Sequence, residues 1–102
     1  MTKTYWIDDT KTSKSNCIRH LRASVCRDID DHLEEFVNED YEAAIICGHI
    51  FLPSDLLEVD SDFRNKIFTE YVDRFFKQSL EDLENGKLVR SDDTYFEMRE
   101  EE

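Results

Sequence analysis

The chain has few of the residues that shape turns and cross-links, with 2 Gly, 1 Pro and 3 Cys among 102 residues. So few turn-forming residues argue against a turn-dense β-sandwich and favour a helix-rich domain. An odd number of cysteines and the lack of a charged-then-apolar leader predict free thiols, no signal peptide and a reducing cytoplasm. No apolar run approaches the ~20 residues that a membrane-spanning helix needs.

Basic residues are also scarce, with 13 Lys and Arg against 25 Asp and Glu, for a net charge of −12. A broad basic face for nucleic acid or for an anionic membrane is therefore excluded. The high charge does not imply disorder, because 39% of the residues are hydrophobic and 12% are aromatic, which is enough for one core. Length and composition predict a single domain at residues 1–99 and a frayed acidic tail at residues 100–102.

Two segments repeat apolar residues at steps of three to five residues, close to the period of a helix. The first predicts a long amphipathic helix over residues 15–37, with an apolar stripe formed by Ile18, Leu21, Val25, Ile29, Leu33 and Phe36. The second predicts another over residues 61–83, with a stripe formed by Phe63, Ile67, Tyr71, Phe75 and Leu80. Asp60 is suited to cap the second helix, and Asn85-Gly86 is suited to end it. Both stripes can supply one core.

The remaining segments predict short elements around these helices. Pro53 fits the first position of a short helix, residues 53–59, where its missing N–H is not needed. Gly48 can supply the positive φ of a tight turn, so residues 42–52 predict a β-hairpin in which Cys47 is a small buried thiol. Further short strands are expected at residues 2–9, 87–90 and 94–98. The sequence therefore predicts an α+β fold: two long amphipathic helices and one short helix packed with a small antiparallel β-sheet.

Charge is distributed unevenly along the chain. Residues 1–27 hold six Lys or Arg against two Asp, a net +4, whereas residues 28–102 hold seven Lys or Arg against 23 Asp or Glu, a net −16. The change falls inside the first long helix, whose early turns carry Arg19, Arg22 and Arg27. That order opposes the helix dipole, which favours acidic side chains near the start of a helix and basic ones near its end, by ~0.3–1 kcal/mol per charge. We therefore expect either pairing with other surfaces or a surface kept acidic for a partner.

The later turns of this helix form the candidate binding surface. Acidic side chains recur there at steps of three and four residues, which places them in rows that can approximate part of a phosphate track. His32, within these rows, is expected to balance surface charge. The competing interpretation is a solvated face that keeps the protein in solution. We expect the carboxylates to meet the basic, nucleic-acid-binding groove of a protein partner, through Asp28, Asp31, Glu34, Glu35, Glu39 and Asp40.

No residue pattern predicts an enzyme. Cys17 with His20 and Cys47 with His49 could supply four zinc ligands, but the spacing lacks the usual Cys-x₂₋₄-Cys form. No local spacing brings a Cys nucleophile to a His base. The acids within residues 55–62 could in principle hold calcium, but two of them are expected at helix starts. We therefore expect no catalytic residue, no metal and no cofactor.

Two resemblances add to these expectations. The block at residues 51–60, followed by Phe63-Arg64 and residues 68–73, resembles a pattern in small uncharacterised phage and bacterial proteins. There a short strand leads to Pro-Ser, a short helix, an Asp and an aromatic-bearing amphipathic helix, so this resemblance implies a fold and no activity. In size, acidity and aromatic content, the chain is similar to phage-encoded inhibitors of host defence, of the Ocr-like anti-restriction and acidic anti-CRISPR type. These place carboxylates where phosphates bind, although the net basic residues 1–27 favour a local acidic face over a whole-surface mimic.

We accordingly expect a non-enzymatic protein of the host-cell cytoplasm that binds and inhibits a host nucleic-acid-handling defence complex. One alternative is a self-associating structural or regulatory module. In that case the basic early turns of the first helix would meet the acidic later turns of a second copy in an antiparallel homodimer. Another alternative is an immunity protein or antitoxin against a basic nuclease, which would use the same acidic face. None of these involves direct contact with nucleic acid or with a membrane.

Overall fold

The computed structural model describes residues 2–101 and contains three helices, a four-stranded sheet and a separate two-stranded hairpin. It confirms the predicted α+β fold with two long helices and one short one. In chain order the elements are β1 Thr2–Ile7, β2 Thr10–Thr12, α1 Lys14–Asp40, β3 Ala44–Ile46, β4 His49–Phe51, α2 Pro53–Val59, α3 Ser61–Glu84, β5 Val89–Ser91 and β6 Thr94–Glu101.

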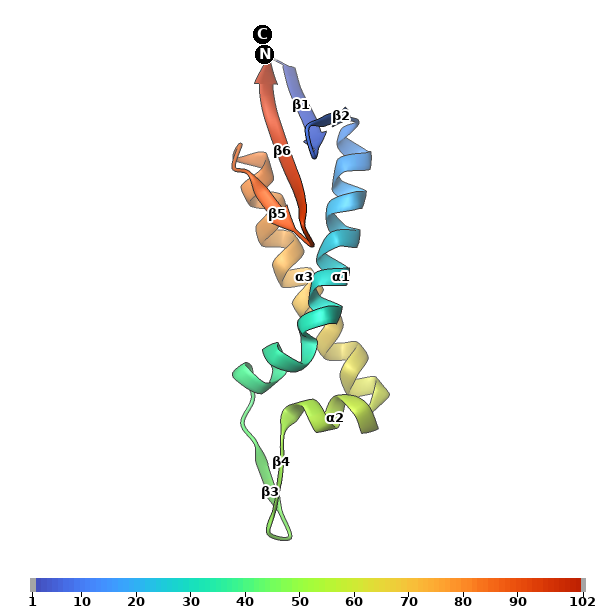
Figure 1. Ribbon diagram of the computed structural model, residues 1–102, viewed down its shortest axis with the longest axis vertical. Coiled ribbons are helices and arrows are strands. Elements are labelled where there is room, and N and C mark those ends of the chain that lie inside the picture. The colour runs from blue at the N-terminus through green and yellow to red at the C-terminus, as the bar shows by residue number, and fades with distance from the viewer. Residues whose placement is uncertain (1, 102) are drawn as a thin grey trace.

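The molecule is long and narrow, with extents of 66, 19 and 19 Å along its principal axes. Figure 1 shows the sheet and both termini at one end, with α1 and α3 running side by side away from it. At the other end α2 crosses beneath the long helices, and the β3–β4 hairpin projects beyond them. These are called the sheet end and the hairpin end below.

The sheet has the strand order β2-β1-β6-β5, and all neighbours are antiparallel. β1 and β6 pair along their length, from Thr2 opposite Glu101 to Ile7 opposite Phe96. β2 is a strand that the sequence did not predict, because its three polar residues carry no alternating apolar pattern. Glu100 and Glu101, expected in a frayed tail, instead continue β6 because β1 supplies their backbone partners. Glu102 lies outside the described residues.

The core lies between the inner face of this sheet and the two long helices. Side chains alternate along the strands, so that Tyr5, Phe96 and Met98 point inward while Trp6 and Arg99 lie on the outer face. Among the described side chains, no buried polar nitrogen or oxygen lacks a hydrogen-bond partner. The helices contribute Cys17, Leu21, Val25, Ile29, Leu33, Val37, Ile67, Tyr71, Val72 and Leu83.

The helix boundaries follow their caps. Ser13 begins α1 by accepting a hydrogen bond from the Asn16 N–H at 3.2 Å, and Asp60 begins α3 by accepting one from the Phe63 N–H at 3.1 Å. α1 runs three residues beyond the predicted end at residue 37, so its last turn includes Asp40. α2 has its predicted bounds, and α3 ends one residue later than expected.

The hairpin has the predicted turn but not the predicted surroundings. Cys47 and Gly48 both have positive φ, +52° and +81°, as a two-residue type I′ turn requires. The hairpin forms its own sheet, and every residue from 41 to 52 is exposed. The prediction that Cys47 is a buried thiol is therefore wrong: apolar neighbours in the sequence suggested a core strand, but no other element covers it.

Candidate functional site

The six carboxylates predicted as a binding surface all lie on the second half of α1, and five of them are exposed while Asp28 is half-buried. They do not share one face. Four of them line two hollows, Asp40 contacts α3, and Glu39 lines neither hollow.

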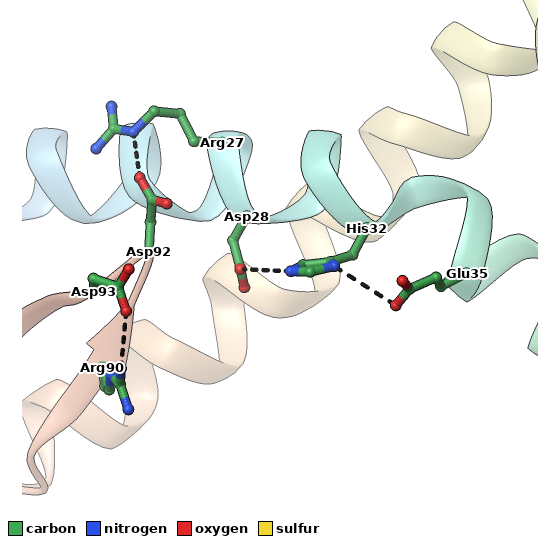
Figure 2. Close-up of polar contacts among 7 residues, drawn as sticks. All are labelled: Arg27, Asp28, His32, Glu35, Arg90, Asp92 and Asp93. Atoms are coloured by element: carbon green, nitrogen blue, oxygen red, sulfur yellow. Dashed lines mark hydrogen bonds and ion pairs between the residues drawn. The ribbon is translucent and has the colours of Figure 1, made fainter.

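The first hollow lies between α1 and the β5–β6 turn, and Figure 2 shows its polar contacts. His32 lies between Asp28 and Glu35, with ring nitrogens 3.8 and 3.6 Å from their oxygens. The turn brings two further carboxylates beside α1, which spacing along the sequence could not indicate. The hollow is lined by Asp28, Asp31, His32, Arg90, Ser91, Asp92 and Asp93.

Two arginines partly neutralise this first hollow. The Arg27 Nε donates to Asp92 at 2.6 Å, and an Arg90 guanidinium nitrogen donates to Asp93 at 2.8 Å. The hydrogen bond to Asp93 also raises the pKa of Arg90, so that side chain stays charged. Asp92 and Asp93 also close the β5–β6 turn, where both have positive φ.

The second hollow lies where α1, α2 and α3 meet, and its acids outnumber its bases more strongly. It is lined by Asp30, Asp31, Leu33, Glu34, Glu35, Leu57, Glu58 and Arg64. Arg64 of α3 is its one base, and it donates to Asp30 at 3.0 Å. Asp31 and Glu34 form no ion pair with any of the described residues, so their carboxylates remain available to a partner.

Asp40 differs from the other five predicted site residues because it faces α3. The Tyr71 O–H donates to its Oδ2 at 2.5 Å, and an Arg74 nitrogen lies 3.6 Å from the same oxygen. Burial raises the pKa of Tyr71, and the hydrogen bond to Asp40 raises it further, so the tyrosine remains a donor at neutral pH. Asp40 therefore ties the end of α1 to α3, and its place on the binding surface stays a prediction. Glu39, its neighbour, is exposed and forms no ion pair among residues 2–101.

The basic early turns of α1 are partly engaged within the chain. Arg27 binds Asp92, and the Arg22 guanidinium lies 5.5 Å from the centre of the Phe76 ring. Arg19 bonds to the Asn16 side chain one turn earlier. These contacts explain part of the charge order that opposes the dipole of α1, because tertiary partners compensate for it.

Within residues 2–101, no group of three or more His, Cys, Asp or Glu side chains is placed to hold a metal ion. Cys17 is buried near the start of α1, and burial and the nearby Glu84 raise its thiol pKa. Cys47 is at the hairpin turn, at the opposite end of the molecule (Figure 1). Asp60 accepts a backbone hydrogen bond at the start of α3, as predicted, and Asp55 accepts one at the start of α2, where the sequence predicted no cap.

Comparison with known protein families, characterised proteins and solved structures gave no match to this chain. Within the described part of the chain, no helix is both long and apolar enough to cross a membrane.

Proposed function

We propose that this protein is a non-enzymatic inhibitor that binds the basic groove of a nucleic-acid-handling host-defence complex, with carboxylates in the place of phosphates. The observation that carries the proposal is one uninterrupted stretch, residues 28–63, which holds 12 Asp or Glu and no Lys or Arg. This stretch forms the later half of α1, the hairpin and α2. Such a segment repels nucleic acid and attracts a surface built to bind it.

Apart from the exposed Glu39, the carboxylates that support this proposal lie on the two hollows. Asp31 lines both of them, and Glu34 and Glu35 extend the acidic surface along the second. From Asp28 to Glu35, α1 rises about 10 Å, close to the axial span of three phosphate steps in one DNA strand at about 3.4 Å each. We define the acidic surface as Asp28, Asp31, Glu34, Glu35 and Glu39.

An antiparallel α1–α1 homodimer receives less support. It would need the basic early turns of α1 to meet the acidic later turns of a second copy. Arg27 already binds Asp92 within the chain, and Arg22 lies over Phe76. An immunity protein or antitoxin would use the same acidic surface against a basic nuclease, so the choice of target in the experiment distinguishes it from an inhibitor of host defence.

The test compares two charge-reversed variants of the full chain in DNA-cleavage assays with purified restriction enzymes, CRISPR effector complexes and basic nuclease toxins. The first variant carries Asp31→Lys, Glu34→Lys and Glu35→Lys on the acidic surface. The matched control carries Glu70→Lys, Asp73→Lys and Glu81→Lys, which change the net charge equally at exposed positions of α3. We expect inhibition by the wild type and the control, and loss of inhibition by the first variant.

Salt provides the second measurement. Affinity for the inhibited complex should fall steeply between about 50 and about 200 mM salt, because attraction between charged surfaces is screened. Affinity that is independent of salt would contradict the proposal, as would equal loss of inhibition in both variants. Inhibition of a nuclease toxin alone would favour the immunity-protein function instead.

A further inference from the structure

The hairpin end is an apolar tip without charge. Residues 43–54 contain no Asp, Glu, Lys or Arg in a chain in which 37% of residues are charged. Eight of the 11 exposed large hydrophobic side chains of the described chain lie between residues 41 and 59. We call these eight the apolar tip: Tyr41, Ile45, Ile46, Ile50, Phe51, Leu52, Leu56 and Val59. Exposed apolar surface concentrated in one place is typical of an interaction site.

Both faces of the hairpin contribute to this surface. Ile45 lies opposite Ile50 on one face, while Ala44 lies opposite Phe51 on the other. A two-stranded hairpin without a covering layer is only marginally stable in water. The hairpin therefore lacks the partner layer that the sheet at the opposite end has.

The base of the hairpin is nevertheless held firmly. The Asn38 amide of α1 accepts a hydrogen bond from the Ser54 N–H at 2.9 Å and donates one to the Ser54 hydroxyl at 3.1 Å. The Leu52 N–H donates to the Asp55 carboxylate at 2.8 Å. These bonds join the end of α1 to the start of α2, so the two strands leave the body from a defined position (Figure 1).

The strand edges show how a second copy can complete the hairpin. β3 and β4 pair only with each other, so each keeps one edge with unpaired backbone groups. A two-fold axis brings equivalent edges together in antiparallel orientation and extends two strands to four. The three other exposed large hydrophobic residues, Phe75, Leu88 and Tyr95, lie outside residues 41–59. Another apolar tip is therefore the best match that a second copy offers.

The tip can be covered without burying a charge, because residues 43–54 contain no Asp, Glu, Lys or Arg. The net charge of −12 lies in the flanking residues 28–63, so two copies joined at the tip repel one another, and this repulsion is weakest at high salt. A lipid surface is a poorer occupant, because no Lys or Arg lies between residues 28 and 63 to attract anionic headgroups. We propose that the apolar tip is a homodimer interface in which the β3–β4 hairpins of two copies pair edge to edge.

This interface is separate from the acidic surface, and salt affects the two in opposite directions. Salt weakens attraction between the acidic surface and a basic partner, but it screens the repulsion between two acidic copies. Dimerisation through the apolar tip should therefore strengthen as salt rises from about 0.01 to about 1 M. An α1–α1 dimer held by opposite charges would instead dissociate over that range.

The experiment is sedimentation equilibrium of the full chain over a range of protein concentrations at low and high salt. The variant is Ile50→Lys, which places a charge on an exposed side chain of the tip, and the matched control is Leu88→Lys at the sheet end, where the side chains are 69% and 62% exposed respectively. We expect a salt-strengthened dimer for the wild type and the control. Ile50→Lys should raise the dimer Kd by on the order of tenfold or more, with an unchanged circular-dichroism spectrum.

Cross-linking supplies an independent readout, because Cys47 is the one fully exposed cysteine of the described chain and lies at the tip. A short bismaleimide should join two wild-type chains through Cys47, and Cys47→Ser or Ile50→Lys should abolish the product. A monomer at every concentration and salt would overturn the proposal. So would a dimer that survives Ile50→Lys, a dimer that dissociates as salt rises, or a monomer that floats with phosphatidylcholine vesicles.

Discussion

At the sheet end, Asp8-Asp9 and Asp92-Asp93 close hairpins whose strands lie on a buried core, whereas Cys47-Gly48 closes a hairpin that no helix covers. All three turns place two consecutive residues at positive φ, so their local geometry is the same. They differ in what surrounds them. Helices α1 and α3 supply the second layer for the four-stranded sheet, but no element within residues 2–101 covers β3 and β4.

The turns of the covered sheet and of the uncovered hairpin also differ in their side chains. At the sheet end, carboxylates hold the turns in place: Asp8 accepts the Tyr95 N–H at 2.9 Å, Asp9 pairs with Arg99 at 3.1 Å, and Asp92 pairs with Arg27. The β3–β4 turn has a thiol and a glycine at the equivalent positions, and residues 41–52 form no ion pair with any described residue. The comparison indicates that the sheet end provides stability, while the hairpin end is free to serve an interface.

The largest expected effect is a difference in how much an alanine substitution at each end lowers the free energy of unfolding. Phe96 is 0% exposed, so Phe96→Ala leaves a cavity and should lower the free energy of unfolding by about 3–5 kcal/mol. Ile50→Ala at the hairpin end should change it by less than about 0.5 kcal/mol, because that side chain has no core contacts to lose. Urea unfolding at low protein concentration, followed by circular dichroism, measures both values.

If Phe96→Ala does not fold, the milder Phe96→Leu keeps the comparison measurable. If Ile50→Ala lowered the free energy of unfolding as much as the Phe96 variants do, the hairpin would be part of the cooperative core. The two ends would then not differ in stability.

An intermediate effect is expected at the junction between the ends, where Tyr71 donates to Asp40. Tyr71→Phe removes this hydrogen bond and should cost about 1 kcal/mol. The pKa of Tyr71 is raised in the folded protein, whereas an unfolded tyrosine ionises near pH 10. Above about pH 10 the unfolded chain therefore releases a proton that the folded chain keeps, and stability falls as pH rises.

The measurement is the free energy of unfolding at neutral pH and across the alkaline range. Tyr71→Phe should be less stable at neutral pH and should lose less further stability above about pH 10 than the wild type. Tyr95→Phe is the matched control, since its hydroxyl forms no hydrogen bond within residues 2–101, and it should behave as the wild type does. If Tyr71→Phe and the wild type lost the same stability at alkaline pH, the role assigned to the Tyr71 hydroxyl would be contradicted.

The smallest effect should come from exchanging turn residues between the ends. Asp93 has a φ of +59°, so Asp93→Gly relieves backbone strain and should stabilise the protein by about 0.5 kcal/mol, after the cost of unfolded-state entropy. Gly48→Ala should strain only the hairpin, because no atom beyond the two adjacent residues lies within 4 Å of the added methyl group. It should speed amide hydrogen exchange in β3 and β4 while leaving global unfolding unchanged.

Urea unfolding together with residue-resolved hydrogen exchange distinguishes these outcomes. Destabilisation by Asp93→Gly would mean that the exposed Asp93–Arg90 ion pair outweighs the strain, which is unusual for a surface pair. A lower free energy of global unfolding in Gly48→Ala would mean that the two ends unfold as one unit.

Local patterns in the sequence were sufficient for most of the fold. The apolar stripes predicted α1 and α3, and Pro53, Asp60 and Gly48 marked the start of α2, the start of α3 and the hairpin turn. β2 escaped prediction because polar residues on an edge strand carry no apolar alternation. The end of α1 was placed three residues early, because the Tyr71 contact that stabilises Asp40 comes from another helix.

The acidity of residues 28–63, the periodicity of the two long helices and the α+β class follow from the sequence alone, because composition and spacing act through local chemistry. Only the tertiary structure decided which carboxylates stand free and which are occupied. Distant segments supply Arg27, Arg64 and Tyr71 as partners of Asp92, Asp30 and Asp40, whereas Asp31 and Glu34 remain available. The tertiary structure also decided that the apolar residues 44–51 lie outside the core. Burial requires another element to pack against them, and no element within residues 2–101 does so.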